Sequence, residues 1–309
     1  MNKCIGCGNY TEKEDLCERC FRIKNYNDYK KVSIESNKIN SILKEITSND
    51  TVVLVVDLLN IPNNFEIIKK YISNDIILVL NKYDLMPNNN EERYRTYFKK
   101  YSLNVIETFC ISCKKNYNID LLYDYICKYS DKNVYFIGYT NSGKSSLINK
   151  LIYNYSNIDT KITTSPISNT TLDTIKIQIN DLVLIDTPGI IGDTLPYLDN
   201  FLLRKISKSN KIKPITYQIK GRQYIVIENI IEIEVENNDI TIYVPNNISV
   251  KRYYKNHGLF SDSHIINYIV EPKSDIVISE IGFIKINKSG NINIKLKNKM
   301  SCFVRNSLI

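Results

Sequence analysis

The sequence predicts an α/β domain at its centre, a short cysteine-rich segment before it and a mainly β domain after it. Apolar runs of strand length alternate with helix-like stretches through the middle of the chain. Near residue 215 the pattern changes to alternation of apolar and polar residues, interrupted by turn residues. Four of the eight cysteines fall within the first 20 residues. These patterns divide the chain into segments 1–24, 25–204 and 205–309.

The α/β domain is predicted from five apolar runs and the helix-like stretches between them, a pattern typical of a mostly parallel sheet. The expected strands are 51–59, 75–82, 103–112, 133–138 and 181–186. The expected helices are 64–72, 91–101, 117–129 and 145–155. Ligands bind at the C-terminal ends of the strands in such sheets, so the residues that end each apolar run are candidates for a binding site.

Composition places the chain among globular proteins. With 43% hydrophobic and 24% charged residues, the 309-residue chain can bury a core and differs from disordered proteins. Its apolar runs are shorter than the ~18 residues of a membrane span. The N-terminus lacks the features of a signal or transit peptide. We therefore expect a cytoplasmic protein without a membrane partner.

The formal charge of +8 is concentrated in the C-terminal third. Residues 205–309 carry 16 lysines and arginines against 9 aspartates and glutamates, a net charge of +7. A basic domain attached to a neutral one suggests a polyanionic partner such as nucleic acid. Residues 251–255 (KRYYK) interleave cations with aromatic rings, which suits phosphate contact and base stacking. A solvated, solubilising surface is the alternative explanation for both features.

Cys4, Cys7, Cys17 and Cys20 form two CxxC pairs, the spacing of a tetrahedral zinc site. Disulfides are the competing interpretation, but a chain without a secretory signal keeps its thiols reduced. Four thiolates complete the coordination shell of zinc and leave no position for a reacting water. The prediction is a structural zinc finger in residues 1–24.

Residues 133–149 (NVYFIGYTNSGKSSLIN) predict a phosphate-binding loop between a strand and a helix. The segment Gly138–Ser145 fits G-x-x-x-x-G-K-[ST], whose glycines let backbone N–H groups surround phosphates. Lys144 would neutralise the β- and γ-phosphates, Ser145 would offer a hydroxyl to Mg²⁺, and the helix N-terminus adds partial positive charge. The residues expected to contact the nucleotide here are Asn141, Ser142, Gly143, Lys144, Ser145 and Ser146.

A later apolar run ends in Asp186-Thr-Pro-Gly189. There the carboxylate can hold Mg²⁺ through water, and the N–H of Gly189 can reach the γ-phosphate. Hydroxyl residues between the two motifs stand where a switch segment would lie. Thr171 is the candidate for the second Mg²⁺ hydroxyl beside Ser145, although an ordinary loop and strand would explain that stretch equally well.

The candidate base-reading residues come earlier in the chain, in the NKYD sequence at 81–84. Asp84 would accept hydrogen bonds from the ring N–H and the exocyclic amine of guanine, Asn81 would support O6 and N7, and Lys82 would lay its stem over the base. Adenine would leave Asp84 buried and unpaired, at a cost of ~1–3 kcal/mol. A second loop near the base is predicted at Ser112, Cys113 and Lys114.

The order of these motifs is rotated relative to the usual G domain. Here the base reader and second base loop come first, followed by the phosphate loop, the switch threonine and Asp-Thr-Pro-Gly. Joining the original termini and opening the chain elsewhere would produce this order without changing the sheet. The fold predicted for the central segment is therefore a circularly permuted P-loop G domain.

Through NKYD, GYTNSGKS and DTPG, the chain resembles the YqeH family of circularly permuted GTPases over all three segments. The resemblance implies a zinc finger, GTP or GDP as the nucleotide, and a role in assembly of the small ribosomal subunit. It also implies ribosomal RNA or a precursor of that subunit as the partner, and we expect a monomer. Two positions depart from the family pattern: Cys113 replaces a common alanine, and Asn169 replaces a usual glycine.

Ile190 follows Asp-Thr-Pro-Gly, at the position where many GTPases have a glutamine that orients water. Isoleucine cannot position a water, so we expect slow hydrolysis. Resemblance to GTPases with a similar apolar residue suggests a potassium ion, or a group from a partner, as the substitute. Asn141 matches the asparagine that holds potassium in such enzymes, although an asparagine that stabilises its own turn is the alternative. Catalysis is assigned to Lys144, Thr171 and Asn141.

Two functions of different kinds are compatible with the sequence. The first is a GTPase switch in ribosome assembly. The second is an RNA-binding scaffold whose GTP site is structural and does not hydrolyse its nucleotide. Turnover of GTP that ribosomal subunits stimulate would separate the two.

Overall fold

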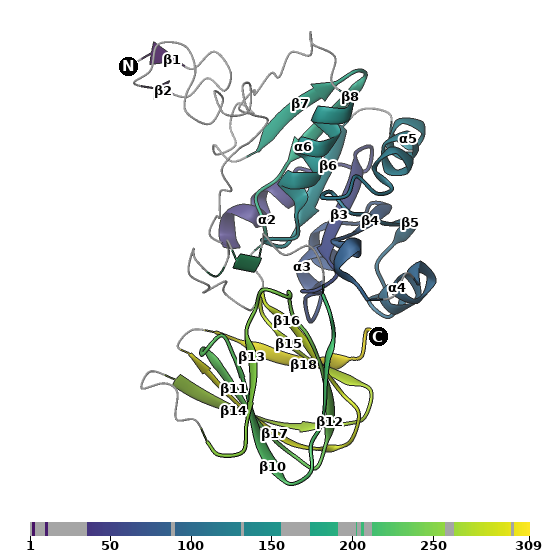
Figure 1. Ribbon diagram of the computed structural model, residues 1–309. Helices are drawn as coiled ribbons and strands as arrows, with labels where there is room; N and C mark the ends of the chain where they lie inside the picture. Colours follow the sequence, from purple (N-terminus) through teal and green to yellow (C-terminus); the bar gives the residue numbers. More distant parts are fainter. Residues whose placement is uncertain are drawn as a thin grey trace. The chain divides into compact units, whose positions relative to one another are not determined.

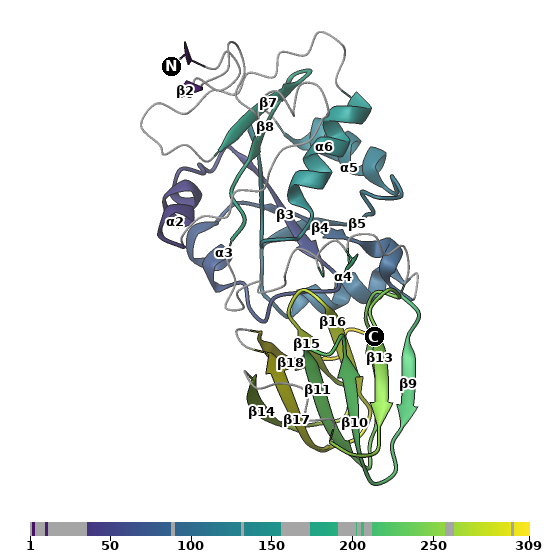
Figure 2. The ribbon, with the colours of Figure 1, turned by 60° about the vertical axis from the view of Figure 1, so that its left-hand side comes forward.

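The computed structural model describes residues 2–3, 10–11, 36–87, 90–130, 133–155, 174–190, 202, 205–206, 212–256, 263–297 and 300–309. The chain divides into two compact units, shown as ribbons in Figures 1 and 2. The first unit comprises Met1–Leu58, Asn64–Tyr83 and Phe98–Gly192. The second comprises Leu59–Asn63, Asp84–Tyr97 and Asp193–Ile309.

The first unit is built on a mixed sheet whose strand order, over the described residues, is β5-β4-β3-β6-β8-β7. Its strands are β3 (Thr51–Asp57), β4 (Ile76–Asn81), β5 (Val105–Cys110), β6 (Asn133–Gly138), β7 (Ile175–Ile179) and β8 (Leu182–Asp186). Neighbours run parallel except β7, which is antiparallel to β8. The central strands β3, β4 and β6 are almost continuous apolar runs because each is buried on both faces. A separate short pair, β1 (Asn2–Lys3) and β2 (Tyr10–Thr11), is antiparallel.

Helices cover both faces of the central strands (Figure 2). The helices of the described chain are α2 (Ser36–Lys44), α3 (Glu66–Tyr71), α4 (Glu91–Lys99), α5 (Ile119–Tyr129) and α6 (Lys144–Tyr155), with a 3₁₀ turn, η1 (Tyr83–Leu85). Leu122 and Ile126 of α5 join Leu147 and Leu151 of α6 in one core cluster against the sheet. In Figure 2, α2 and α3 lie on the other side of the sheet. Among these described helices, each is too short or too polar to cross a bilayer.

The predicted elements of the α/β domain are confirmed, most of them a few residues shorter than expected. Two elements, α2 and β7, have no counterpart among the predictions. Helix α2 is polar except for Ile39, Ile42 and Leu43, which are all buried. Three apolar residues at helical spacing give too little periodicity to identify a helix from sequence.

The second unit contains two antiparallel sheets that enclose a core rich in isoleucine, which confirms the mainly β C-terminal region. In the described residues their orders are β13-β10-β11-β17-β14 and β18-β15-β16-β12-β9. The strands are β9 (Ile215–Gln218), β10 (Arg222–Ile227), β11 (Ile231–Glu236), β12 (Asp239–Tyr243), β13 (Val250–Tyr253), β14 (Ser263–Val270), β15 (Ser274–Ile278), β16 (Gly282–Ile286), β17 (Gly290–Lys297) and β18 (Cys302–Asn306). Arg93 of α4 belongs to this unit and donates from Nε to the carbonyl of Leu308 at 3.0 Å.

The C-terminal ends of four parallel strands of the first unit carry polar or glycine residues. Asp57 ends β3, Asn81 ends β4, Gly138 ends β6 and Asp186 ends β8. Parallel neighbours end at the same edge of a sheet, so these four residues lie along one edge. This edge is where a ligand site of an open α/β sheet is expected.

Candidate active site

The phosphate loop is shaped by two residues in the left-handed region, Asn141 (φ 62°) and Gly143 (φ 88°). A Cβ atom on Gly143 would collide with Nδ2 of Asn81, so only glycine fits this point of the loop. The loop turns through a hydrogen bond from the N–H of Ser142 to the carbonyl of Tyr139 (3.2 Å), and α6 begins at Lys144. The free N–H groups of a helix N-terminus and this turn form the type of concave site that binds anions.

Lys144 and Asp186 face each other at the centre of the site. The Nζ of Lys144 contacts Oδ1 of Asp186 and the carbonyl of Thr187, and all three side chains are buried. Ser145 and Ser146 follow Lys144 in the first turn of α6. Lys144 is therefore held beside the carboxylate that is predicted to hold Mg²⁺. A bound phosphate and its metal ion would take the place of the direct contact between Lys144 and Asp186.

The Asp-Thr-Pro-Gly segment is attached to the phosphate loop by backbone hydrogen bonds. The N–H of Ile190 donates to the carbonyl of Gly138, and the N–H of Thr140 donates to the carbonyl of Ile190, each at 2.9 Å. A Cβ atom on Gly189 would lie 3.0 Å from the side chain of Thr140, so the two segments pack closely. The side chain of Ile190 is fully buried, and it therefore does not reach a water at the γ-phosphate.

Asn81 connects the base-reading segment to the phosphate loop. Its Nδ2 donates to the carbonyl of Ser142 at 3.0 Å, although 61 positions separate the two residues in sequence. Its Oδ1 accepts from the N–H of Cys113 at 3.4 Å. One side chain thus joins three predicted motifs, the base reader, the second base loop and the phosphate loop.

Asp84 has the property expected of a ligand-binding carboxylate. Its Oδ2 atom is buried and meets no hydrogen-bond partner among the described residues. A buried carboxylate oxygen without a donor costs free energy, so such atoms mark places where a ligand or water donates. The ring N–H and exocyclic amine of guanine are donors of this kind, and the residues present therefore fit a guanine nucleotide.

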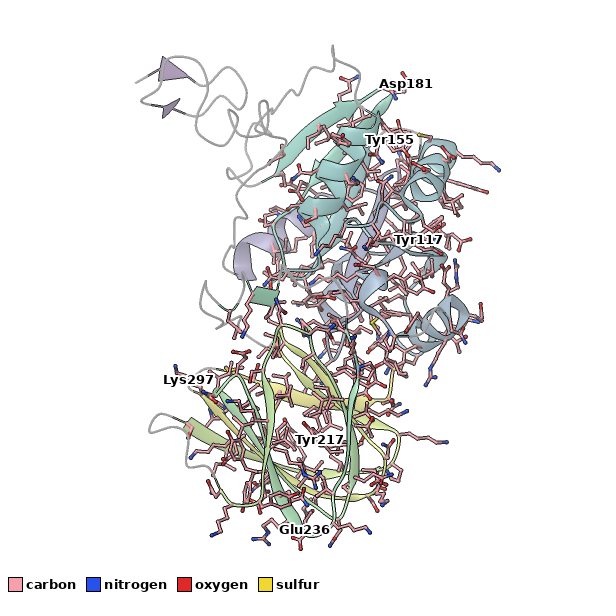
Figure 3. All side chains as sticks on the ribbon, viewed as in Figure 1. Tyr117, Tyr155, Asp181, Tyr217, Glu236 and Lys297 are labelled. Atoms are coloured by element: carbon pink, nitrogen blue, oxygen red, sulfur yellow. The ribbon has the colours of Figure 1, made fainter. Side chains whose placement is uncertain are left out.

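The second base loop is closed on itself. The backbone groups of Ser112 and Tyr117 exchange hydrogen bonds of 3.2 and 3.0 Å, and the hydroxyl of Ser112 accepts from the N–H of Lys115. Tyr117, labelled in Figure 3, stacks on Tyr83 of the NKYD segment with ring centroids 5.7 Å apart. These contacts hold the exposed tip with Lys114 beside the base-reading segment. The sequence motifs do not identify Tyr83 or Tyr117 as part of the site; their position within and next to the two loops is the only available signal.

Five predicted site residues lie outside the described part of the chain: Cys4, Cys7, Cys17, Cys20 and Thr171. The zinc finger and the switch threonine therefore stay predictions. Within the residues that the structure describes, no group of three or more His, Cys, Asp and Glu side chains gathers as a metal site would require.

Comparison with known proteins agrees with this geometry. Residues 133–251 match a family described as 50S ribosome-binding GTPase. The whole chain is 28% identical to "Uncharacterized protein YqeH" of Bacillus subtilis (strain 168), covering 99% of both proteins. Over nearly its whole length the chain is therefore similar to a YqeH protein. This confirms the recognition from the NKYD, GYTNSGKS and DTPG motifs, and the YqeH match extends over the zinc-finger and C-terminal segments as well.

Other similar proteins match a smaller part of the chain. "Genetic interactor of prohibitins 3, mitochondrial" from Saccharomyces cerevisiae (strain ATCC 204508 / S288c) is 29% identical over 48% of this chain and 27% of its own length. A solved GDP-bound structure of TM YlqF covers 54% of this chain and 63% of its own, with 20% identity and a TM-score of 0.34. The match to a GTPase family model supports an enzyme that hydrolyses GTP.

Proposed function

We propose that this protein is a slow GTP-hydrolysing switch that acts in the cytoplasm during assembly of the small ribosomal subunit. Two observations support the nucleotide: Asn81 contacts the phosphate loop, and Oδ2 of Asp84 is buried without a hydrogen-bond partner in the described part of the chain. A ribosomal role is supported by the match to a family described as 50S ribosome-binding GTPase, whereas the choice of the small subunit rests on the resemblance to YqeH-type GTPases. The rotated motif order supports a circularly permuted domain.

The test is co-sedimentation of the full chain with purified small and large ribosomal subunits, each with GTP, GDP or no nucleotide, at one fixed salt concentration. We expect nucleotide-dependent binding to the small subunit or its precursor and stimulation of GTP turnover. A difference of ~1–3 kcal/mol in binding between the GTP and GDP states is typical of such coupling. Preference for the large subunit would refute the small-subunit role. Binding without turnover would support the scaffold alternative.

Hydrolysis is proposed to depend on a potassium ion held by Asn141, or on a group from the ribosomal partner. The buried side chain of Ile190 supports a substitute for the missing glutamine. Asn141 has φ 62°, so an alanine there would strain the loop, whereas Asn141→Gly removes the amide and keeps that conformation accessible. We expect faster turnover in potassium than in sodium, and loss of the difference in Asn141→Gly. Equal wild-type rates in both salts would exclude potassium and leave the partner.

The C-terminal unit is proposed to contact ribosomal RNA through the exposed residues of β13 and the segment after it. Arg252 is held by its own unit, because its guanidinium lies over the rings of Tyr217 and Tyr254 and its Nε donates to Gln223 (Figure 3 labels Tyr217). Lys251 is exposed and Tyr254 is 73% exposed, so these two are available to phosphate and base. Replacing Lys251 by alanine should reduce the salt slope of RNA binding by about 1. Lys297→Ala is the control, because Lys297 is also an exposed lysine of this unit and its backbone is not left-handed.

The N-terminal cysteines are proposed to bind one structural zinc ion. The first CxxC pair lies in sequence between β1 and β2, which pair as an antiparallel hairpin. Metal analysis of reduced protein should find one zinc per chain, and replacement of Cys17 by serine should remove it while GDP binding survives. Absence of zinc in the wild-type protein would contradict this assignment.

A further inference from the structure

Asp57 is a buried carboxylate at the C-terminal end of the central strand β3, where the nucleotide site is proposed. It is the last residue of β3, pairs in register with Asn81 of β4, and is 6% exposed. Ionised carboxylates are rarely buried unless a positive group compensates them. Asp57 is not part of the NKYD, GYTNSGKS or DTPG motifs. Its position at the C-terminal end of β3 explains why it lies near the site but assigns it no role.

The compensating charge comes from the base-reading segment itself. The Nζ of Lys82 lies 2.5 Å from Oδ2 of Asp57, and the lysine side chain is 31% exposed. The backbone of Lys82 is left-handed, with φ 64°, and the N–H of Leu58 donates to the carbonyl of Asn81 at 3.2 Å. Backbone and side chain therefore join the end of β3 to the segment that reads the base.

We propose that Asp57 is a positioning residue for guanine, acting through Lys82. A lysine stem has four rotatable bonds and adopts many rotamers when its ammonium group is in water. The Asp57 carboxylate holds the ammonium at one point, so that the methylene groups form a fixed apolar surface against the face of the base. This inference rests on the proposed guanine site, and it assigns a new residue to it.

The competing explanation is that the ion pair only stabilises the ends of β3 and β4. A neutral replacement would then lower stability and leave nucleotide affinity unchanged. Asp50 provides a matched control, because it flanks the other end of the same strand β3. It accepts hydrogen bonds from the N–H and hydroxyl of Thr47 and from Nδ2 of Asn133. Asp50→Asn should lower the stability of the protein and leave its affinity for the guanine nucleotide unchanged.

The experiment measures GDP and IDP affinity and steady-state GTPase kinetics for the full-length wild type, Asp57→Asn and Asp50→Asn. For Asp57→Asn we expect the Kd for GDP and the KM for GTP to rise about 10-fold, a typical loss for a charged hydrogen bond. The kcat should stay within about twofold, because the phosphate loop is unchanged. IDP affinity should fall by the same factor as GDP affinity, since the stem contacts the face of the base and Asp84 still reads its edge. Asp50→Asn should bind both nucleotides like the wild type.

A double-mutant cycle tests whether Asp57 acts through Lys82. Lys82→Met keeps an apolar stem and removes the charge, so adding Asp57→Asn to it should cause no further loss of GDP affinity. Additive losses would overturn the proposal, as would a change in the GDP to IDP ratio in Asp57→Asn. If the Asp57→Asn protein is less stable but binds GDP like the wild type, the proposal is wrong and the ion pair only stabilises the ends of β3 and β4. Failure of the wild type itself to bind GDP would refute the guanine site rather than the positioning role.

Discussion

The residues predicted to bind the nucleotide and the Asp275–Arg305 pair both include buried charged groups, but these groups are compensated differently. Asp275 and Arg305 are 0% and 5% exposed, and their side chains face each other with Nε 3.4 Å from Oδ2. The N–H of Leu308 donates to the same carboxylate oxygen at 2.9 Å. The guanidinium also lies over the ring of Phe283. Here opposite charges within one unit balance each other.

At the nucleotide site the balance is incomplete. Oδ2 of Asp84 and Oγ of Ser142 are buried without a hydrogen-bond partner in the described chain. Oδ1 of Asp275 and both terminal nitrogens of the Arg305 guanidinium also lack partners among the described residues, so an unpartnered atom alone does not indicate a ligand. The difference is that Asp275 and Arg305 are each other's counter-ion. We therefore expect the Asp275–Arg305 pair to matter for stability, whereas a buried carboxylate oxygen left without a donor is available to a ligand.

Removing one member of the internal pair should have the largest effect on stability. Arg305→Ala would leave Asp275 buried without its counter-ion, and we expect the free energy of unfolding to fall by about 3–5 kcal/mol. Urea denaturation measures this loss. Arg222→Ala is the control from the same unit: Arg222 pairs with Glu234 and Glu236 but is 59% exposed, so its loss should have a much smaller effect on stability. If Arg305→Ala and Arg222→Ala lower the free energy of unfolding by similar amounts, burial does not determine how much an ion pair contributes to stability.

At the nucleotide site, a neutral replacement should change affinity rather than stability. Asp84→Asn exchanges one acceptor for a donor, so GDP affinity should fall about 10- to 100-fold and preference should shift toward xanthosine diphosphate. Isothermal titration with both nucleotides measures this. Asp75→Asn is the control, because Asp75 precedes β4 at its other end and is exposed. If Asp84→Asn lowers stability as much as Arg305→Ala does and leaves GDP affinity unchanged, the two regions do not differ in this way.

The pH dependence of stability should show a smaller effect from the internal pair. Burial raises the pKa of Asp275 above 3.8, and the positive charge of Arg305 opposes that rise only in part. The folded state therefore holds a proton that the unfolded chain releases at lower pH. This contribution is complete below 3.8 and is lost as pH rises through the raised folded pKa. Asp275→Asn should flatten this part of the stability profile, and an unchanged slope would contradict the raised pKa.

The local parts of both units are predictable from sequence. The phosphate loop needs glycines and a lysine at fixed spacing, so G-x-x-x-x-G-K-S identifies it together with its flanking strand and helix. The buried strands β3, β4 and β6 appear as continuous apolar runs, and the C-terminal strands as alternating ones. These signals depend on residues close together in the chain, which is why one sequence suffices to find them.

The contacts that make the site work depend on strand order, which local patterns do not encode. Asn81 reaches the carbonyl of Ser142 across 61 positions because β4, β3 and β6 are neighbours in the sheet. The same order brings Lys82 to Asp57, and pairing of β15 with β18 brings Asp275 to Arg305. The sequence by itself therefore determined the motifs and the elements that carry them. Only the tertiary structure decided which charges compensate one another, because burial and long-range pairing arise when the sheets assemble.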